Sequence, residues 1–251
     1  MKKFLSVILF VLSGSVMAAG GGFPLDKAPV DLENKESLKA GAETFANYCL
    51  SCHAADYMRY NRIGKDLGWT DVEVSEKLIS TRGADGEKTK VGELMKVAMN
   101  NDYASVAFGT KIPGLTVIAR ARGADWLYTY LRTFYMDDSR PSGMNNMVFK
   151  DVGMPHVLWE MQGLQKAVFR TEKGEDDNDK HIYEKMEMVQ AGSMNAEEYD
   201  KFVGDLVNFM VYMGEPMQLE RKSLGIKVIV FLFIFAIIAY LLKKEYWKDV
   251  H

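Results

Sequence analysis

The chain has 251 residues, of which 48% are hydrophobic and 26% charged, a composition typical of one medium globular domain with additional segments. Its formal net charge of −3 argues against nucleic acid as a partner. The two ends depart from this average, because each carries an apolar run that a globular domain does not need.

Residues 1–19 are predicted to be a secretory signal peptide. Two lysines precede an apolar run from Phe4 to Val16, and small residues follow at Ala18 and Ala19. A basic start, an apolar stretch and a small-residue cleavage site are typical of secretion. An uncleaved anchor helix is the alternative, but the apolar run is short for a membrane span. We therefore expect residues 20–222 to form an exported domain.

Both cysteines of the chain lie in the string C-L-S-C-H, from Cys49 to His53. Apolar residues at three- to four-residue steps, from Leu38 through Phe45, predict an amphipathic helix that this string closes. Cys49 and Cys52 face the same side of a helical turn, and His53 follows close to that face. The pattern is the attachment site for a c-type haem, in which each thiol adds across a vinyl group and the histidine supplies one axial nitrogen.

A thioredoxin-like redox pair and half of a zinc site are the alternatives for this string. A zinc site needs about four ligands, and the sequence has no second cysteine pair. A thioredoxin-like pair should follow a strand, whereas a helical pattern precedes this one. We therefore expect one covalent haem c as the cofactor.

The rest of the exported domain is predicted to be mainly α, as a cytochrome c-like haem domain with long loops, because strand-like alternation is weak. Irregular stretches such as 137–153 are expected to cover the haem edges. By analogy with small c-type cytochromes, the last helix should pack on the helix that holds Cys49. The helix signals are capping boxes at Thr70 with Glu73 and at Asn195 with Glu198, an apolar stripe over 124–134, and a stop at Gly214 followed by Pro216.

The second axial ligand of the iron is predicted to be Met154. Three histidines lie outside the motif, and His251 is beyond the C-terminal apolar run. Met154 lies between a glycine and a proline, and the proline biases it away from helical conformation. Thioether ligation raises the haem potential relative to two histidines. His156 is the alternative ligand, although a packing or hydrogen-bonding role beside the haem is preferred for it.

The C-terminal apolar run, residues 223–242, is predicted to be a transmembrane helix in a lipid bilayer. It carries one charge, Lys227, near its start. Twenty residues at about 1.5 Å each cover a hydrocarbon core of about 30 Å. Basic residues flank both ends equally, so the orientation follows from the signal peptide. The large domain should lie outside, and the tail of residues 243–251 inside the cytoplasm.

An acidic run could face a basic partner. Attraction at long range would raise the association rate more than the affinity. The alternative is a solvated acidic loop, as charge runs usually are. The acidic residues are Glu172, Glu175, Asp176, Asp177 and Asp179.

Taken together, the motifs resemble the cytochrome c1 family, the haem subunit of the ubiquinol–cytochrome c oxidoreductase (cytochrome bc1) complex, in its bacterial branch. The resemblance covers most of residues 36–247, and it departs at 112–114, where many members have two prolines and an aspartate. The motifs that carry it are C-L-S-C-H-A-A-D-Y-M-R-Y (49–60), L-T-V-I-A-R-A-R-G (115–123), D-W-L-Y-T-Y-L-R (125–132), V-G-M-P-H-V-L-W-E (152–160) and a single anchor helix.

The resemblance implies that Cys49 and Cys52 bond the haem, that His53 and Met154 ligate the iron, and that Arg120 meets a haem propionate. It implies a one-electron relay from the Rieske iron–sulfur protein to soluble cytochrome c, which needs no general acid, base or nucleophile. Cytochrome b would be a further partner in a dimeric complex. The location would be the bacterial inner membrane, with the haem domain in the periplasm.

Two other functions fit the same motifs. The chain could be a membrane-tethered c-type cytochrome that acts as a free carrier, or a haem subunit of a terminal oxidase or another dehydrogenase. A free carrier should have a flexible linker before its anchor. The predicted last helix ends within about ten residues of the anchor, which favours a subunit fixed close to the membrane.

Overall fold

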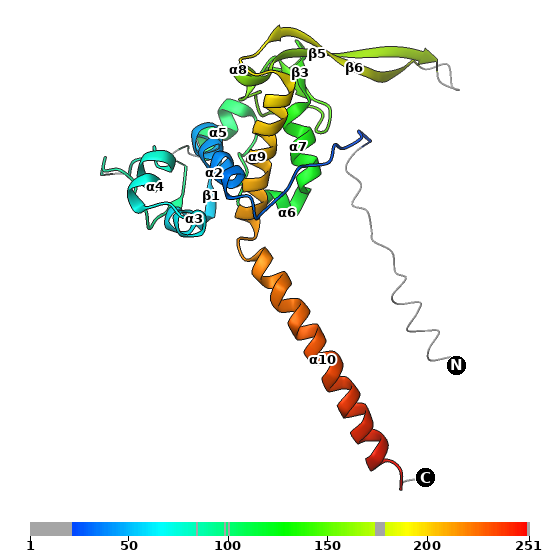
Figure 1. Ribbon diagram of the computed structural model, residues 1–251. Helices are drawn as coiled ribbons and strands as arrows, with labels where there is room; N and C mark the ends of the chain where they lie inside the picture. Colours follow the sequence, from blue (N-terminus) through cyan, green and yellow to red (C-terminus); the bar gives the residue numbers. More distant parts are fainter. Residues whose placement is uncertain (1–21, 84, 98, 100, 174–178, 250–251) are drawn as a thin grey trace.

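The computed structural model describes residues 22–249 except 84, 98, 100 and 174–178. The predicted signal peptide therefore lies outside the described residues. A helical body carries a long hairpin at one end, and a single long helix leaves it at the other (Figure 1). Helix α9 runs through the body, with α2 on one side and α6 and α7 on the other (Figure 1).

The described residues form mostly short helices, together with three antiparallel sheets of two strands each. The prediction of a mainly helical fold is thereby confirmed. The elements are α2 (Lys35–Thr44), η1 (Phe45–Cys49), β1 (Ala55–Arg59), α3 (Tyr60–Leu67), α4 (Asp71–Leu78), β2 (Leu94–Met95), α5 (Asn101–Phe108), α6 (Ile118–Arg122), α7 (Ala124–Arg132), β3 (Phe134–Met136), β4 (Met144–Asn146), α8 (Trp159–Gln162), β5 (Gly163–Lys173), β6 (Asp179–Ala191), α9 (Ala196–Gly214) and α10 (Gln218–Tyr246).

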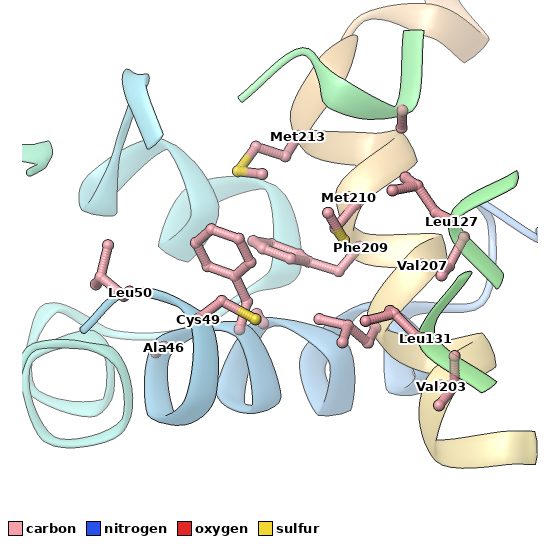
Figure 2. Packing of buried hydrophobic residues seen from close by; sticks show 14 of the residues in the cluster. Ala46, Cys49, Leu50, Leu127, Leu131, Val203, Val207, Phe209, Met210 and Met213 are labelled. Carbon is pink, nitrogen blue, oxygen red and sulfur yellow. The ribbon is translucent and has the colours of Figure 1, made fainter. Parts of the chain in front are cut away.

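The crossing of α2 and α9 forms the centre of the core. A Cβ on Gly41 would lie 2.0 Å from the carbonyl oxygen of Asp205, so only glycine permits the two helices to approach this closely. Phe45 and Phe209 meet beside the crossing with ring centroids 5.7 Å apart. Figure 2 shows Cys49 in the same buried cluster as Phe209 of α9. The predicted packing of the last helix of the domain on the helix before the haem motif is confirmed.

Both predicted capping boxes are present. The Thr70 hydroxyl accepts a hydrogen bond from the Glu73 backbone N–H, and the Glu73 carboxylate accepts one from the backbone N–H of Thr70. Asn195 and Glu198 make the same reciprocal pair at the start of α9. These local bonds satisfy backbone groups that helix termini otherwise leave without partners, which explains why the sequence located both helix starts.

The hairpin of β5 and β6, which are the longest strands described, was not predicted, because the strand-like alternation in the sequence is weak. Two register shifts, at Leu164/Gln165 and Val168/Phe169, break the period of two that identifies a strand in a sequence. Much of the hairpin is also exposed to solvent, so polar residues occur along its length. The apolar stripe predicted over 124–134 belongs to two elements rather than one helix, because α7 ends at Arg132 and Phe134 begins β3.

Helix α10 agrees with the predicted anchor but is longer. It has 29 residues and begins at Gln218, five positions before the predicted start at 223. Its most apolar window has a mean hydropathy of 2.7, and none of that window is buried in the protein. Among the described residues, it is the one helix long and apolar enough to cross a membrane. Three residues, 215–217, separate it from α9, so the domain is held close to the anchor.

Candidate haem site

A cavity of about 340 Å³ lies between the haem motif, the segment 108–115, α6, α7 and the loop around Met154. Its walls are mainly apolar, and its basic lining residues are Lys111 and Arg122. It brings together four of the five predicted site residues. Those four are Cys49, Cys52, His53 and Met154, and the aromatic residues around them are Tyr48, Phe108, Trp126, Tyr130 and Phe149.

The haem motif emerges from a widened helical turn. Helix α2 continues into η1, where the backbone N–H of Leu50 bonds the carbonyl of Phe45 at 3.0 Å in a π-type turn. The backbone N–H of His53 then bonds the carbonyl of Cys49 at 2.8 Å. Turns of this kind are rare and occur frequently at functional sites. Here the turn brings both cysteines and His53 to one wall of the cavity.

The Cys49 thiol lacks the lowered pKa of a redox-active cysteine. Burial, together with the charge of Cys52, raises the pKa of the Cys49 thiol to about 12. A disulfide oxidoreductase needs a lowered thiol pKa, because the thiolate is the nucleophile. A zinc site is not supported either, since no cluster of three or more His, Cys, Asp or Glu side chains suited to a metal ion occurs in the described ranges.

His53 is held in an orientation suited to ligation. Its Nδ1 lies 2.8 Å from the carbonyl oxygen of Pro113, to which a protonated Nδ1 donates. That bond leaves the Nε2 lone pair available to a metal, the usual arrangement of a metal-binding histidine. Burial lowers the pKa of His53, which favours the neutral ring that ligation requires. The backbone N–H of Leu115 also bonds the carbonyl of Ala54 at 2.8 Å, which fixes the segment that carries Pro113.

Met154 lies in the cavity wall formed by the loop after β4, and its side chain is half-buried. Its sulfur accepts a hydrogen bond from the Tyr130 hydroxyl at 3.3 Å. The position before it is narrow, because a Cβ on Gly153 would lie 3.2 Å from the carbonyl oxygen of Phe108. Met154 thus places a thioether sulfur, a possible donor atom, in the cavity wall, and its role as the second ligand stays a prediction.

His156, the alternative ligand, lies outside the residues that line the cavity. Its ring is buried and stacks on Phe134 with centroids 4.9 Å apart and planes 1° from parallel. Burial lowers its pKa to about 4, so the ring is neutral at neutral pH. This placement agrees with the packing role preferred for it above.

Arg120, expected at a propionate, does not line the cavity either. Its Cγ lies 3.3 Å from the position that a Cβ on Gly214 would take, beside the end of α9. Arg122 does line the cavity, with its guanidinium 5.2 Å from the Trp126 ring and 5.8 Å from the Phe149 ring. The role of Arg120 stays a prediction, and Arg122 is a second candidate from the same A-R-A-R string.

The acidic run is described only in part. Residues 175–177 lie outside the described residues, and the side chain of Asp179 is not described. Glu172 is exposed near the end of β5, where it pairs with Arg170 at 3.0 Å. Docking by this run stays a prediction.

Sequence reasoning missed Pro113 and Tyr130, which contact the two predicted ligands. A signal for Tyr130 exists, because it belongs to the apolar stripe of 124–134. That stripe does not tell which of its members faces a ligand and which packs on α9. Pro113 acts through its backbone carbonyl, a group that every residue has, so the sequence gives no signal for it.

The site fits a covalent haem. One cavity contains two thiols, a histidine with a free Nε2, a thioether and mainly apolar walls. Together with the fold and α10, it defines a membrane-anchored c-type cytochrome. A profile described as the cytochrome c1 family matches residues 26–250. The chain therefore belongs to the cytochrome c1 family, and its cofactor is covalent haem c.

Curated proteins are similar in sequence to this chain over all or nearly all of its length. Cytochrome c1 of Allochromatium vinosum is 44% identical over 250 residues, covering 100% of this chain and 99% of that protein. A Nitrosomonas europaea protein named ammonia monooxygenase gamma subunit is 47% identical over 251 residues, with 100% and 99% covered. Cytochrome c1 of Rhodospirillum rubrum is 23% identical, with 96% of each chain covered. The family supports a role as the haem-bearing electron carrier subunit of a cytochrome bc1 complex, in association with cytochrome b.

Proposed function

We propose that the protein takes single electrons from a Rieske iron–sulfur protein and passes them to a soluble cytochrome c. The observation that carries this proposal is the cavity that unites both cysteines, His53 and Met154. The haem, when bound there, supplies an iron couple that changes by one electron. The protein's contribution is then to hold the cofactor, set its potential and exclude water.

Individual residues have distinct tasks in this proposal. Cys49 and Cys52 would hold the cofactor covalently, and His53 and Met154 would supply the ligands of its iron. The Pro113 carbonyl orients His53. Arg120 or Arg122 pairs with a propionate, since a planar guanidinium suits a carboxylate and favours its charged form.

We further propose that the haem domain lies in the periplasm of a bacterial inner membrane. The predicted signal peptide of residues 1–19 and the single helix α10 support this orientation. Helix α10 begins at Gln218, ahead of the apolar stretch 223–242 that would cross the bilayer, so the exported domain would end near 222 and the tail 243–251 would lie in the cytoplasm. A dimeric complex with cytochrome b, and docking of soluble cytochrome c at the acidic run, complete the proposal.

The first test is the composition of the complex purified from native membranes. A b-type haem protein and a Rieske protein should co-purify, and quinol should reduce the haem of this chain. Isolation as a lone monomer would favour the free carrier, and co-purification with a terminal oxidase or an ammonia monooxygenase would contradict the proposal.

The second test replaces the proposed ligand. In Met154→Leu the sulfur-to-iron charge-transfer band should vanish and the reduction potential should fall, because a thioether ligand favours the reduced iron. The matched control is Met144→Leu, a buried methionine of β4 that is not among the cavity residues. A charge-transfer band that survives Met154→Leu would refute the assignment.

A further inference from the structure

Tyr130 connects α7 to the proposed iron ligand. Its hydroxyl donates to the Met154 sulfur at 3.3 Å, a normal length for a hydrogen bond to sulfur. Both residues line the haem cavity. The contact joins residues 24 positions apart, so it exists only because the loop of Met154 folds back over α7. Because its acceptor is the proposed ligand atom, this hydrogen bond acts on the iron through the Met154 sulfur.

The Tyr130 ring is fixed by packing that does not involve the sulfur. It stacks on Trp126 with centroids 4.8 Å apart and planes 11° from parallel, and it meets Phe134 edge-on at 5.1 Å. Its own carbonyl accepts a hydrogen bond from the Asn146 side chain at 2.7 Å. The direction of the hydroxyl is therefore set by the scaffold, which is how a preorganised supporting group acts.

The Tyr130 side chain is largely shielded from water, because the residue is only 8% exposed. A buried hydroxyl needs a partner, and a thioether sulfur is a weak acceptor. Both groups are thus satisfied by the same contact.

We propose that Tyr130 is a positioning residue that orients the Met154 sulfur toward the iron and raises the reduction potential of the haem. The inference rests on the proposed ligation by Met154. One sulfur lone pair accepts the hydrogen bond, which leaves the other available to the iron. The bond also withdraws electron density from the sulfur, which weakens its donation to Fe(III) more than to Fe(II). Partners of metal ligands commonly act on affinity and potential in this manner.

The test is a redox titration of Tyr130→Phe in the intact complex, followed by haem absorbance. Loss of a hydrogen bond should lower the equilibrium constant for reduction about threefold to tenfold. At 59 mV per tenfold for one electron, the potential should fall by about 30 to 60 mV. The charge-transfer band should weaken or shift as the sulfur loses its orientation.

The matched control is Tyr128→Phe. Tyr128 lies on the same helix and is also 8% exposed, but it packs under Arg132 and is not among the cavity residues. This variant loses a hydroxyl from the same helix and should keep the wild-type potential and band. Equal potentials in both variants and in the wild type would overturn the inference.

A second variant tests the hydroxyl without removing it. Incorporation of 3-fluorotyrosine at position 130 keeps the ring and makes the hydroxyl a stronger donor, so the potential should rise rather than fall. This reversed sign is not expected from a packing role. If Tyr130→Phe fails to retain haem, the protein with 3-fluorotyrosine provides the test by itself. A haem potential in that protein equal to or lower than the wild-type value would refute the proposed role of Tyr130.

The outcome also separates this inference from the ligand assignment. If Met154→Leu abolishes the charge-transfer band while both changes at Tyr130 leave the potential unaltered, Met154 remains the ligand and only the role of Tyr130 fails. If the band survives in Met154→Leu, the assignment of the ligand itself fails, and the inference about Tyr130 fails with it.

Discussion

The two walls of the haem cavity are built in different ways. The attachment wall, residues 49–53, is one continuous segment at the end of a helix. A second wall combines the loop of Met154 with Tyr130 and Arg122 from two short helices. The attachment wall follows from local spacing, whereas the second wall depends on how distant segments pack. A change in the first should therefore abolish the site, and a change in the second should adjust it.

The largest effect is expected at the attachment wall. Cys49→Ser combined with Cys52→Ser removes both thiols, so covalently bound haem should be lost completely from the denatured protein on a gel. Ser51→Ala is the matched control, because Ser51 is an exposed residue between the two cysteines. Covalent haem in the double variant would contradict the assignment of the motif.

The scaffold behind the attachment wall should give the next largest effect. In Gly41→Ala, the new Cβ would lie 2.0 Å from the Asp205 carbonyl oxygen, so α2 and α9 must separate. Overpacking of this kind costs about 3 kcal/mol of unfolding free energy.

Thermal unfolding of the haem domain, followed by haem absorbance, measures this loss. The control is Gly225→Ala in the exposed helix α10, where a Cβ would meet nothing within 4 Å. A stability of Gly41→Ala equal to that of the control would show that the helices do not approach so closely.

The smallest effect is expected from the two arginines of α6, Arg120 and Arg122. Arg122 lines the cavity and Arg120 does not, so Arg122→Gln should shift the haem potential more than Arg120→Gln. A cation near the haem disfavours the oxidised iron, so its loss should lower the potential. Because both side chains are exposed, solvent screening limits the change to about threefold in the reduction equilibrium. A larger shift in Arg120→Gln would support the prediction made from the resemblance.

The sequence located features that depend on neighbouring residues. The capping boxes at Thr70 and Asn195 occur where they were expected, because each is formed by groups three positions apart. The hairpin of β5 and β6 was missed because its register shifts remove the alternation that the sequence would otherwise display. The apolar anchor was recognised from its composition, and helix α10 extends it by a polar first turn that begins at Gln218.

By itself, the sequence determined the attachment motif of a covalent haem, with its adjacent histidine, and the apolar helix near the C-terminus. Each of these follows from residue type and short spacing, which a chain carries before it folds. Only the tertiary structure decided that Pro113 orients His53, that Tyr130 contacts Met154, and that Arg122 rather than Arg120 reaches the cavity. These contacts join segments separated by up to 60 residues, and packing of the core rather than local pattern brings them together.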